Sequence, residues 1–192
     1  MEFNILSEKE RGYLFGLFEG DGYKFHDIKC RRFQVEFYLN SLRDKEIIKF
    51  LTNLLKKIGL NPNLYQDKRY NCKRIRVYSK ELFQILNKNI PLKNIEKNFG
   101  IGFVSGVIDS EGYVNSKKSF IMLVNTNKIM LEECGSFLNN LDIKSHISKR
   151  KPSEKEVKDS YRMYISVKFK RLGHLSVKAG SLVETKVFRL AG

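Results

Sequence analysis

The sequence predicts an α+β fold built from two pseudo-symmetric repeats, each running helix, strand, strand, helix, strand, strand and a closing helix. Three observations predict it: a ten-residue segment that recurs 90 positions later, a strand after each copy that alternates cleanly in the first, and an amphipathic helix after each of those strands. The 192 residues are enough for one domain or two small halves, since a domain usually takes ~100–200 residues.

The repeated segment carries small residues at every fourth position, followed by an acid, a glycine and a tyrosine. The first copy has Gly12, Gly16, Gly20 and then Asp21-Gly22-Tyr23; the second has Gly102, Gly106, Ser110 and then Glu111-Gly112-Tyr113. Agreement in small, apolar and acidic positions over this length indicates two copies of one structural unit. We expect a first repeat over residues 1–88, a linker over 89–97 and a second repeat over 98–192.

In the first repeat, Ser7 and Glu10 have the spacing of a capping box that begins the repeated helix. Residues 32–40 alternate between apolar and polar side chains, which is typical of a half-buried strand. The next helix is expected over 47–58, with apolar residues on one stripe and Gly59 at its C-terminal cap. Two further strands are expected over 62–69 and 73–78.

The second repeat shows the same order. A strand is expected over 120–125, a helix over 130–141, and two strands over 144–150 and 161–168. No clear period follows Phe169, where glycines at 173 and 180 interrupt the pattern.

The charge points to an anionic partner. Thirty-six Lys and Arg against 21 Asp and Glu give a net charge of +15, with a pI near 9.7. Such a surplus favours a nucleic-acid partner. A membrane is the other anionic surface, but the run from Gly100 to Ile108 is far shorter than the ~20 residues needed to span one.

Other chemistries lack their motifs. Three cysteines without C-x-x-C spacing predict neither zinc fingers nor a disulfide framework, and they fit a reducing intracellular compartment, cytoplasm or organelle. No phosphate-binding glycine loop ending in Lys-Ser or Lys-Thr is present, so no nucleotide cofactor is expected.

The small residues of the repeated helices leave one face without side chains, which lets two helix backbones approach closely. Paired in this way, the helices would bring Asp21 and Glu111 together at one end. Acids there meet the negative end of each helix dipole and repel each other, so a divalent cation such as Mg²⁺ would stabilise them. The alternative is that both residues merely begin Asp-Gly and Glu-Gly turns, which explains one copy better than two.

These segments, Leu14-Phe15-Gly16-Leu17-Phe18-Glu19-Gly20-Asp21-Gly22 and Val104-Ser105-Gly106-Val107-Ile108-Asp109-Ser110-Glu111-Gly112, resemble the LAGLIDADG motif. The chain resembles a single-chain, two-motif LAGLIDADG homing endonuclease over nearly its full length. The resemblance implies a monomer whose motif helices form the interface and whose two antiparallel sheets form a saddle over double-stranded DNA. It also implies catalytic Mg²⁺, with Mn²⁺ able to substitute, held by Asp21 and Glu111 and by the carbonyls of Gly20 and Ser110. Glu19 and Asp109 are interpreted as packing groups, not ligands.

The family often places Lys or Gln near the end of the second strand to orient the attacking water. The matching stretches here, Leu39-Asn40-Ser41 and Val124-Asn125-Thr126, offer Asn40 and Asn125 for that catalytic role. Basic residues nearby that could orient water are Lys24, Arg43, Lys118 and Lys128. Each could equally contact a phosphate or remain a solvated charge.

The polar faces of the expected strands carry long hydrogen-bond donors suited to base edges. We expect DNA contacts from Arg32, Gln34, Tyr38, Arg74, Arg76, Arg162 and Lys168. Arginine pairs with guanine and glutamine with adenine in the major groove. The alternative for any one strand is an ordinary solvent-exposed face.

The function expected from these observations is metal-dependent cleavage of both strands of a long, asymmetric DNA target by a protein encoded in an intron. The alternative is a cleavage-inactive relative that acts as an RNA maturase or DNA-binding regulator. The survival of both acids favours the enzyme. A generic basic RNA-binding or ribosome-binding protein would explain the charge but not the repeat.

Overall fold

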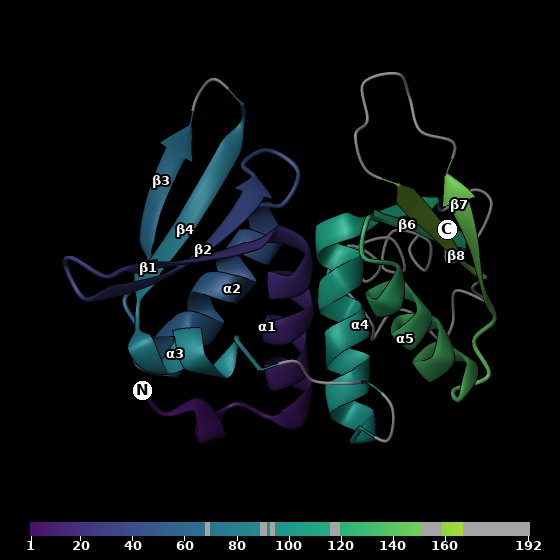
Figure 1. Ribbon diagram of the computed structural model, residues 1–192, viewed down its shortest axis with the longest axis horizontal. Coiled ribbons are helices and arrows are strands. Elements are labelled where there is room, and N and C mark those ends of the chain that lie inside the picture. Colours follow the sequence, from purple (N-terminus) through teal and green to yellow (C-terminus); the bar gives the residue numbers. More distant parts are fainter. Residues whose placement is uncertain (68–69, 89–91, 93–94, 116–119, 151–158, 167–192) are drawn as a thin grey trace, which may run out of the picture.

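The computed structural model describes residues 1–67, 70–88, 92, 95–115, 120–150 and 159–166. Two halves lie side by side, each with a four-stranded antiparallel sheet, and the long helices α1 (Glu8–Asp21) and α4 (Lys97–Glu111) stand next to each other at the centre (Figure 1). The predicted fold class is confirmed. None of the helices in these ranges is long and apolar enough to cross a membrane.

The first half repeats the predicted order of elements. After a 3-10 turn, η1 (Phe3–Ile5), and α1 come β1 (Gly22–Asp27), β2 (Arg32–Asn40), α2 (Lys45–Lys57), β3 (Asn63–Asp67), β4 (Cys72–Tyr78) and the short α3 (Lys80–Ile85). The strand order β1-β2-β4-β3 defines sheet A. α1, α2 and α3 lie on its inner face, where Val35, Phe37 and Ile75 are buried (Figure 1).

The second half has the same topology. It contains α4, β5 (Gly112–Asn115), β6 (Phe120–Asn125), α5 (Lys128–Asn139), β7 (Ser145–Arg150) and β8 (Ser160–Ser166). The order β5-β6-β8-β7 defines sheet B. The closing helix expected after β8, and most of the expected linker over 89–97, lie outside the described residues.

Local signals account for the ends of these helices. The Ser7 hydroxyl accepts from the Glu10 amide at 3.2 Å, and the Ser7 amide donates to Glu10 Oε2 at 2.8 Å, which confirms the capping box. Gly59, just past α2, has φ +79°, a left-handed conformation that glycine adopts without strain.

The two central helices pack backbone against backbone. A Cβ placed on Gly12, Gly16 or Gly102 would come within about 2 Å of a carbonyl oxygen on the opposite helix. Only a residue without a side chain fits at these positions, so the repeated glycines are the cause of the close approach. One contiguous hydrophobic core extends from the first half through this interface into the second.

Candidate metal site and nucleic-acid interface

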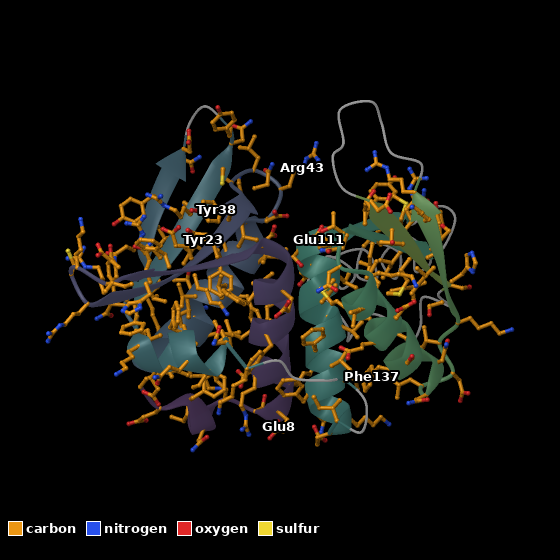
Figure 2. The ribbon with its side chains drawn as sticks, in the orientation of Figure 1. Glu8, Tyr23, Tyr38, Arg43, Glu111 and Phe137 are labelled. Carbon is orange, nitrogen blue, oxygen red and sulfur yellow. The ribbon has the colours of Figure 1, made fainter. Side chains whose placement is uncertain are left out.

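The C-terminal ends of α1 and α4 meet. Asp21 is the last residue of α1 and Glu111 the last residue of α4. A Cβ on Gly20 would lie 2.1 Å from Ser110 Oγ and 3.1 Å from Glu111 Cγ, so the last turns of the two helices touch. Figure 2 shows Glu111 at this end of the molecule and Glu8, at the start of α1, at the opposite end.

The donors at this end are oxygen atoms. Neither helix has a basic residue in its last turn, so no helix-end lysine or arginine offsets the negative dipole ends beside Asp21 and Glu111. The last carbonyls of a helix, here including those of Gly20 and Ser110, have no partner within it. Within the described residues no group of three or more His, Cys, Asp or Glu could hold a metal ion. Two carboxylates fit Mg²⁺, which commonly takes one or two and completes its shell with water and substrate phosphate.

Asn125 contacts one of these acids directly. Its Nδ2 donates to Glu111 Oε1 at 2.9 Å, which orients that carboxylate. Asn40 shares only a turn contact with Asn125: its Oδ1 accepts from the amides of Leu42 and Arg43, both at 3.0 Å, as Asn125 Oδ1 accepts from the Asn127 amide at 2.7 Å.

The strand register explains the difference. Phe37 pairs with Gly22 and Ile75, and Leu123 pairs with Gly112 and Met163. Because Gly22 and Gly112 are equivalent residues of the two repeats, Phe37 is equivalent to Leu123. Two residues further along each strand, Leu39 is therefore equivalent to Asn125. The match of Asn40 with Asn125 was wrong by one residue, and one residue is enough to turn a side chain to the other face of a sheet.

The four basic candidates for orienting water lie in different surroundings. Lys24 pairs with Val35 on the inner side of sheet A, and its Nζ donates to Asn87 Oδ1 at 2.5 Å. Lys128 forms a 2.7 Å ion pair with Glu132 on α5. Arg43 is exposed in the turn after β2, at the same end of the molecule as Glu111 (Figure 2). Lys118 lies outside the described residues.

The outer face of sheet A gathers most of the predicted DNA-contacting residues. Arg32, Gln34, Tyr38, Arg74 and Arg76 all lie on it. An open hollow of about 810 Å³ on this face is lined by Tyr38, Tyr65, Gln66, Asp67, Tyr70, Cys72 and Arg74. Burial, Asp67 and then the Asp21 carboxylate raise the pKa of the Cys72 thiol, which lines the hollow.

The outer face of sheet B has a different composition. Arg162 lies on it opposite Val124, and Tyr164 lies opposite Met122. Lys168, the remaining predicted contact, lies outside the described residues. The middle strands of sheet A therefore carry Arg32, Arg74 and Arg76 on the outer face, where those of sheet B carry Met122, Val124 and Arg162.

Sequence reasoning missed three residues near these faces. Glu36 is buried among the arginines of sheet A, and Tyr65 lies opposite Arg74 from the neighbouring strand. Cys72 is the first residue of β4, and Asp21 contributes to raising the pKa of its thiol. For Glu36 and Tyr65 the only available signal was their place in the alternation of the expected strands, which does not distinguish a functional side chain from a solvated one, and Cys72 lay just outside the expected strands.

A family model described as a LAGLIDADG-like domain matches residues 8–91 and 98–172. The chain belongs to the LAGLIDADG family. A curated relative, an uncharacterised protein of Methanocaldococcus jannaschii, is 29% identical over 195 residues, covering 94% of this chain and 70% of the relative.

Solved LAGLIDADG structures share the fold. Variants of the homing endonuclease I-DmoI superpose with a TM-score of 0.71 at 21% identity, covering 91% of this chain and 97% of theirs. I-DmoI in complex with DNA and calcium gives 0.70 at the same identity and coverage. Full-length DUF199/WhiA from Thermatoga maritima gives 0.64 at 17% identity, over 95% of this LAGLIDADG chain and 61% of that protein.

Proposed function

We propose that this LAGLIDADG protein is a site-specific homing endonuclease that makes double-strand breaks in a long, asymmetric duplex DNA target by divalent-metal-dependent phosphodiester hydrolysis. The observation that carries the proposal is the meeting of Asp21 and Glu111 at the touching ends of two helices, between two antiparallel sheets of a chain with net charge +15. An intron-encoded origin and action as a monomer belong to the same proposal.

Asp21 and Glu111 are proposed to hold the metal, with the carbonyls of Gly20 and Ser110 near them. Bound there, Mg²⁺ or Mn²⁺ would supply an activated water and stabilise the leaving oxygen of the phosphodiester. Structures of I-DmoI with DNA and manganese, and of a variant with DNA and magnesium, support a divalent ion in this role.

The remaining roles follow from position. Asn125 orients the Glu111 carboxylate through its 2.9 Å hydrogen bond. Arg43 is the candidate for a contact with water or the scissile phosphate, because it is exposed at the same end of the molecule as Glu111 (Figure 2). Lys24 and Lys128 are not proposed for that role, since their ammonium groups have partners elsewhere. The arginines of sheet A and Arg162 of sheet B bind the duplex.

The two sheets do not carry the same side chains on their outer faces, so the two halves of the target need not be alike. This supports an asymmetric site in place of a palindrome.

The test begins with selection of duplexes from a randomised library in Ca²⁺, followed by incubation of the selected pool in Mg²⁺ and sequencing of the ends. Wild type is compared with Asp21→Asn and Glu111→Gln, each of which removes one charge from the metal site. Glu8→Gln is the matched control, because it removes a carboxylate from the opposite end of α1 (Figure 2).

Discrete cuts by wild type and Glu8→Gln that vanish in the other two variants, while binding persists, are the expected result. Binding without cuts in Mg²⁺ or Mn²⁺ would contradict the proposal and leave a DNA-binding regulator. Enrichment of RNA but not duplex DNA in a parallel selection would favour a maturase.

A further inference from the structure

Glu36 is an acid on the outer face of sheet A, and yet its side chain is only 2% exposed. It lies in the middle of β2, between Gln34 and Tyr38 on the same face. A carboxylate on a surface that binds DNA phosphate would normally weaken binding by like-charge repulsion. Here neighbouring side chains cover it, so it cannot contact a base or a phosphate itself.

Three side chains cover Glu36, and each contacts its carboxylate. Arg76 Nε donates to Oε1 at 2.5 Å, Arg74 Nε lies 3.5 Å from the same oxygen, and the Tyr38 hydroxyl donates to Oε2 at 2.5 Å. Burial by itself would lower the pKa of Arg76, but the hydrogen bonds to Glu36 and Tyr78 raise it above its ordinary value. One carboxylate therefore lies against both guanidinium groups and accepts a hydrogen bond from that of Arg76.

The same arginines are held from the side by aromatic rings. Tyr65 lies between them, with Arg74 Cζ 4.8 Å and Arg76 Cζ 5.1 Å from its ring centre. Tyr78 continues the row, with Arg76 at 6.0 Å and Arg32 at 5.3 Å. Guanidinium groups stack favourably on aromatic faces. The three arginines and two tyrosines form one alternating row across the outer face of sheet A.

Sheet B lacks this arrangement. In its register Met122 occupies the position of Glu36, since Tyr113 pairs with Met122 as Tyr23 pairs with Glu36. Tyr164 occupies the position of Arg76. The buried carboxylate and its central arginine belong to the first half alone, in the part of the chain that the structure describes.

Arg76 is held at Nε by Glu36 and at Nη1 by the Tyr78 hydroxyl, so Nη2 and the second hydrogen of Nη1 remain for another partner. Guanine presents O6 and N7 in the major groove as two acceptors that match a guanidinium edge. A free arginine loses side-chain entropy when it is fixed on a base, and this cost is lower when the free protein already holds it. A fixed guanidinium also discriminates better than a mobile one, because a mobile one can turn to the nearest phosphate.

We propose that Glu36 is a specificity-determining positioning residue, which holds Arg76 and Arg74 to recognise guanine in the half of the target that lies on sheet A. The inference rests on the proposed binding of duplex DNA but not on cleavage. The half of the target that lies on sheet B faces Met122 and Tyr164 and is recognised without a buried carboxylate that positions arginines.

The experiment measures base preference at each position by sequencing duplexes bound by the full chain in Ca²⁺ from a randomised library. Glu36→Gln keeps the shape of the side chain and removes its charge. Arg76→Lys keeps the charge but cannot present two donors in a plane. Glu46→Gln on α2 is the control for net charge, because it removes an exposed acid from a helix on the other side of the sheet. Arg162→Lys shows which half of the target lies on sheet B.

We expect Glu36→Gln and Arg76→Lys to lower the guanine preference at the same positions about tenfold, the size of one bidentate arginine–guanine contact. The double variant should lose no more than either single one. The salt dependence of binding should stay close to that of wild type, since the number of phosphate contacts is unchanged. Glu46→Gln should keep the full preference, and Arg162→Lys should change only positions in the other half.

The inference is overturned if the Glu36→Gln variant keeps the guanine preference of wild type. It is also overturned if the substitution changes the affinity for every DNA sequence by the same factor. If circular dichroism shows that Glu36→Gln does not fold, Arg76→Lys becomes the test. The inference is then overturned if Arg76→Lys changes the preference for guanine at no position of the selected target. In each of these cases wild type still selects a sequence, so the proposed function stands. A wild-type protein that enriches no duplex at all overturns both.

Discussion

The Tyr13 hydroxyl on α1 donates to Asp109 Oδ2 on α4 at 2.8 Å, across the interface of the two halves and with both side chains buried. Burial and the adjacent Asp109 carboxylate raise the pKa of Tyr13 well above its ordinary value, so the hydroxyl stays protonated and can donate. In the repeat, Phe103 on α4 takes the place of Tyr13 and Glu19 on α1 takes the place of Asp109. Because Phe103 has no hydroxyl, this second pair cannot form the same hydrogen bond. Both helices thus carry small residues at matched positions of the interface, but their polar contacts differ.

Tyr13→Phe should lower the free energy of unfolding by about 1–3 kcal/mol, because the buried Asp109 loses a hydrogen-bond donor. Chemical denaturation at neutral pH measures the change. Tyr23→Phe is the control, since Tyr23 is 49% exposed and its hydroxyl reaches solvent. Equal effects of the two substitutions would show that the buried hydrogen bond contributes nothing to stability.

Gly16→Ala should destabilise the protein by about 3 kcal/mol or more, because the new methyl would lie 1.9 Å from the Phe103 carbonyl oxygen and the helices would have to separate. Gly135→Ala, also inside a helix, is the matched control. Its methyl would first meet the Ser145 hydroxyl at 3.1 Å, and a gain of about 1 kcal/mol in helix propensity offsets that contact. Thermal unfolding of both variants tests the prediction, which fails if Gly16→Ala is as stable as Gly135→Ala.

Asn125→Ala should weaken cleavage and metal affinity about 10- to 100-fold, the usual cost of losing a residue that orients a metal ligand. Metal titration of cleavage, together with calorimetric binding of Ca²⁺, separates this from a loss of DNA affinity. Asn40→Ala should instead lower thermal stability and leave the metal dependence unchanged, because its side chain caps a turn. Identical metal titrations for the two variants would contradict the distinction.

Glu10 should make stability depend on pH. Burial tends to raise its pKa, but the hydrogen bonds from Lys57 and Ser7 outweigh this and lower it below its ordinary value. Its contribution is therefore present above the pKa of the unfolded chain and is lost as the pH falls through the lower folded value. Glu10→Gln keeps an acceptor for the Ser7 amide but loses the charge that pairs with Lys57, so it should cost up to about 1 kcal/mol at pH 7, and the difference from wild type should shrink below a pH of about 4. Denaturation across this range checks it, and a difference that stays constant in acid would refute the assignment.

Much of the fold could be predicted because its signals are local. The alternation over 32–40 predicts β2 to the residue, and the capping box predicts the start of α1. The start of β3 was less accurate, since the strand begins at Asn63 and not at residue 62, and residues 68–69 lie outside the described residues. The expectation that Asp109 is a packing group is confirmed by its burial and its bond to Tyr13.

The candidate site was predicted only in part. The matched spacing of Asp21 and Glu111 predicted that they come together, because the small-residue faces of two repeated helices can pack closely about a pseudo-twofold axis that brings the same helix ends together. The sequence could not predict which of the two asparagines contacts an acid. The match of Asn40 with Asn125 gives no information about strand pairing, and the pairing decides on which face of the sheet each side chain lies.

The sequence by itself determined the duplicated unit, the order of helices and strands, the glycine-lined faces of α1 and α4, and the excess of positive charge, because these depend on residue type and spacing along the chain. Only the tertiary structure decided that Asn125 and not Asn40 contacts a candidate metal ligand, and that Glu36 lies beneath Arg74 and Arg76. Those contacts depend on the register between β2 and β4 and between β6 and β8, and register is set by the packing of whole strands against the helices of each half.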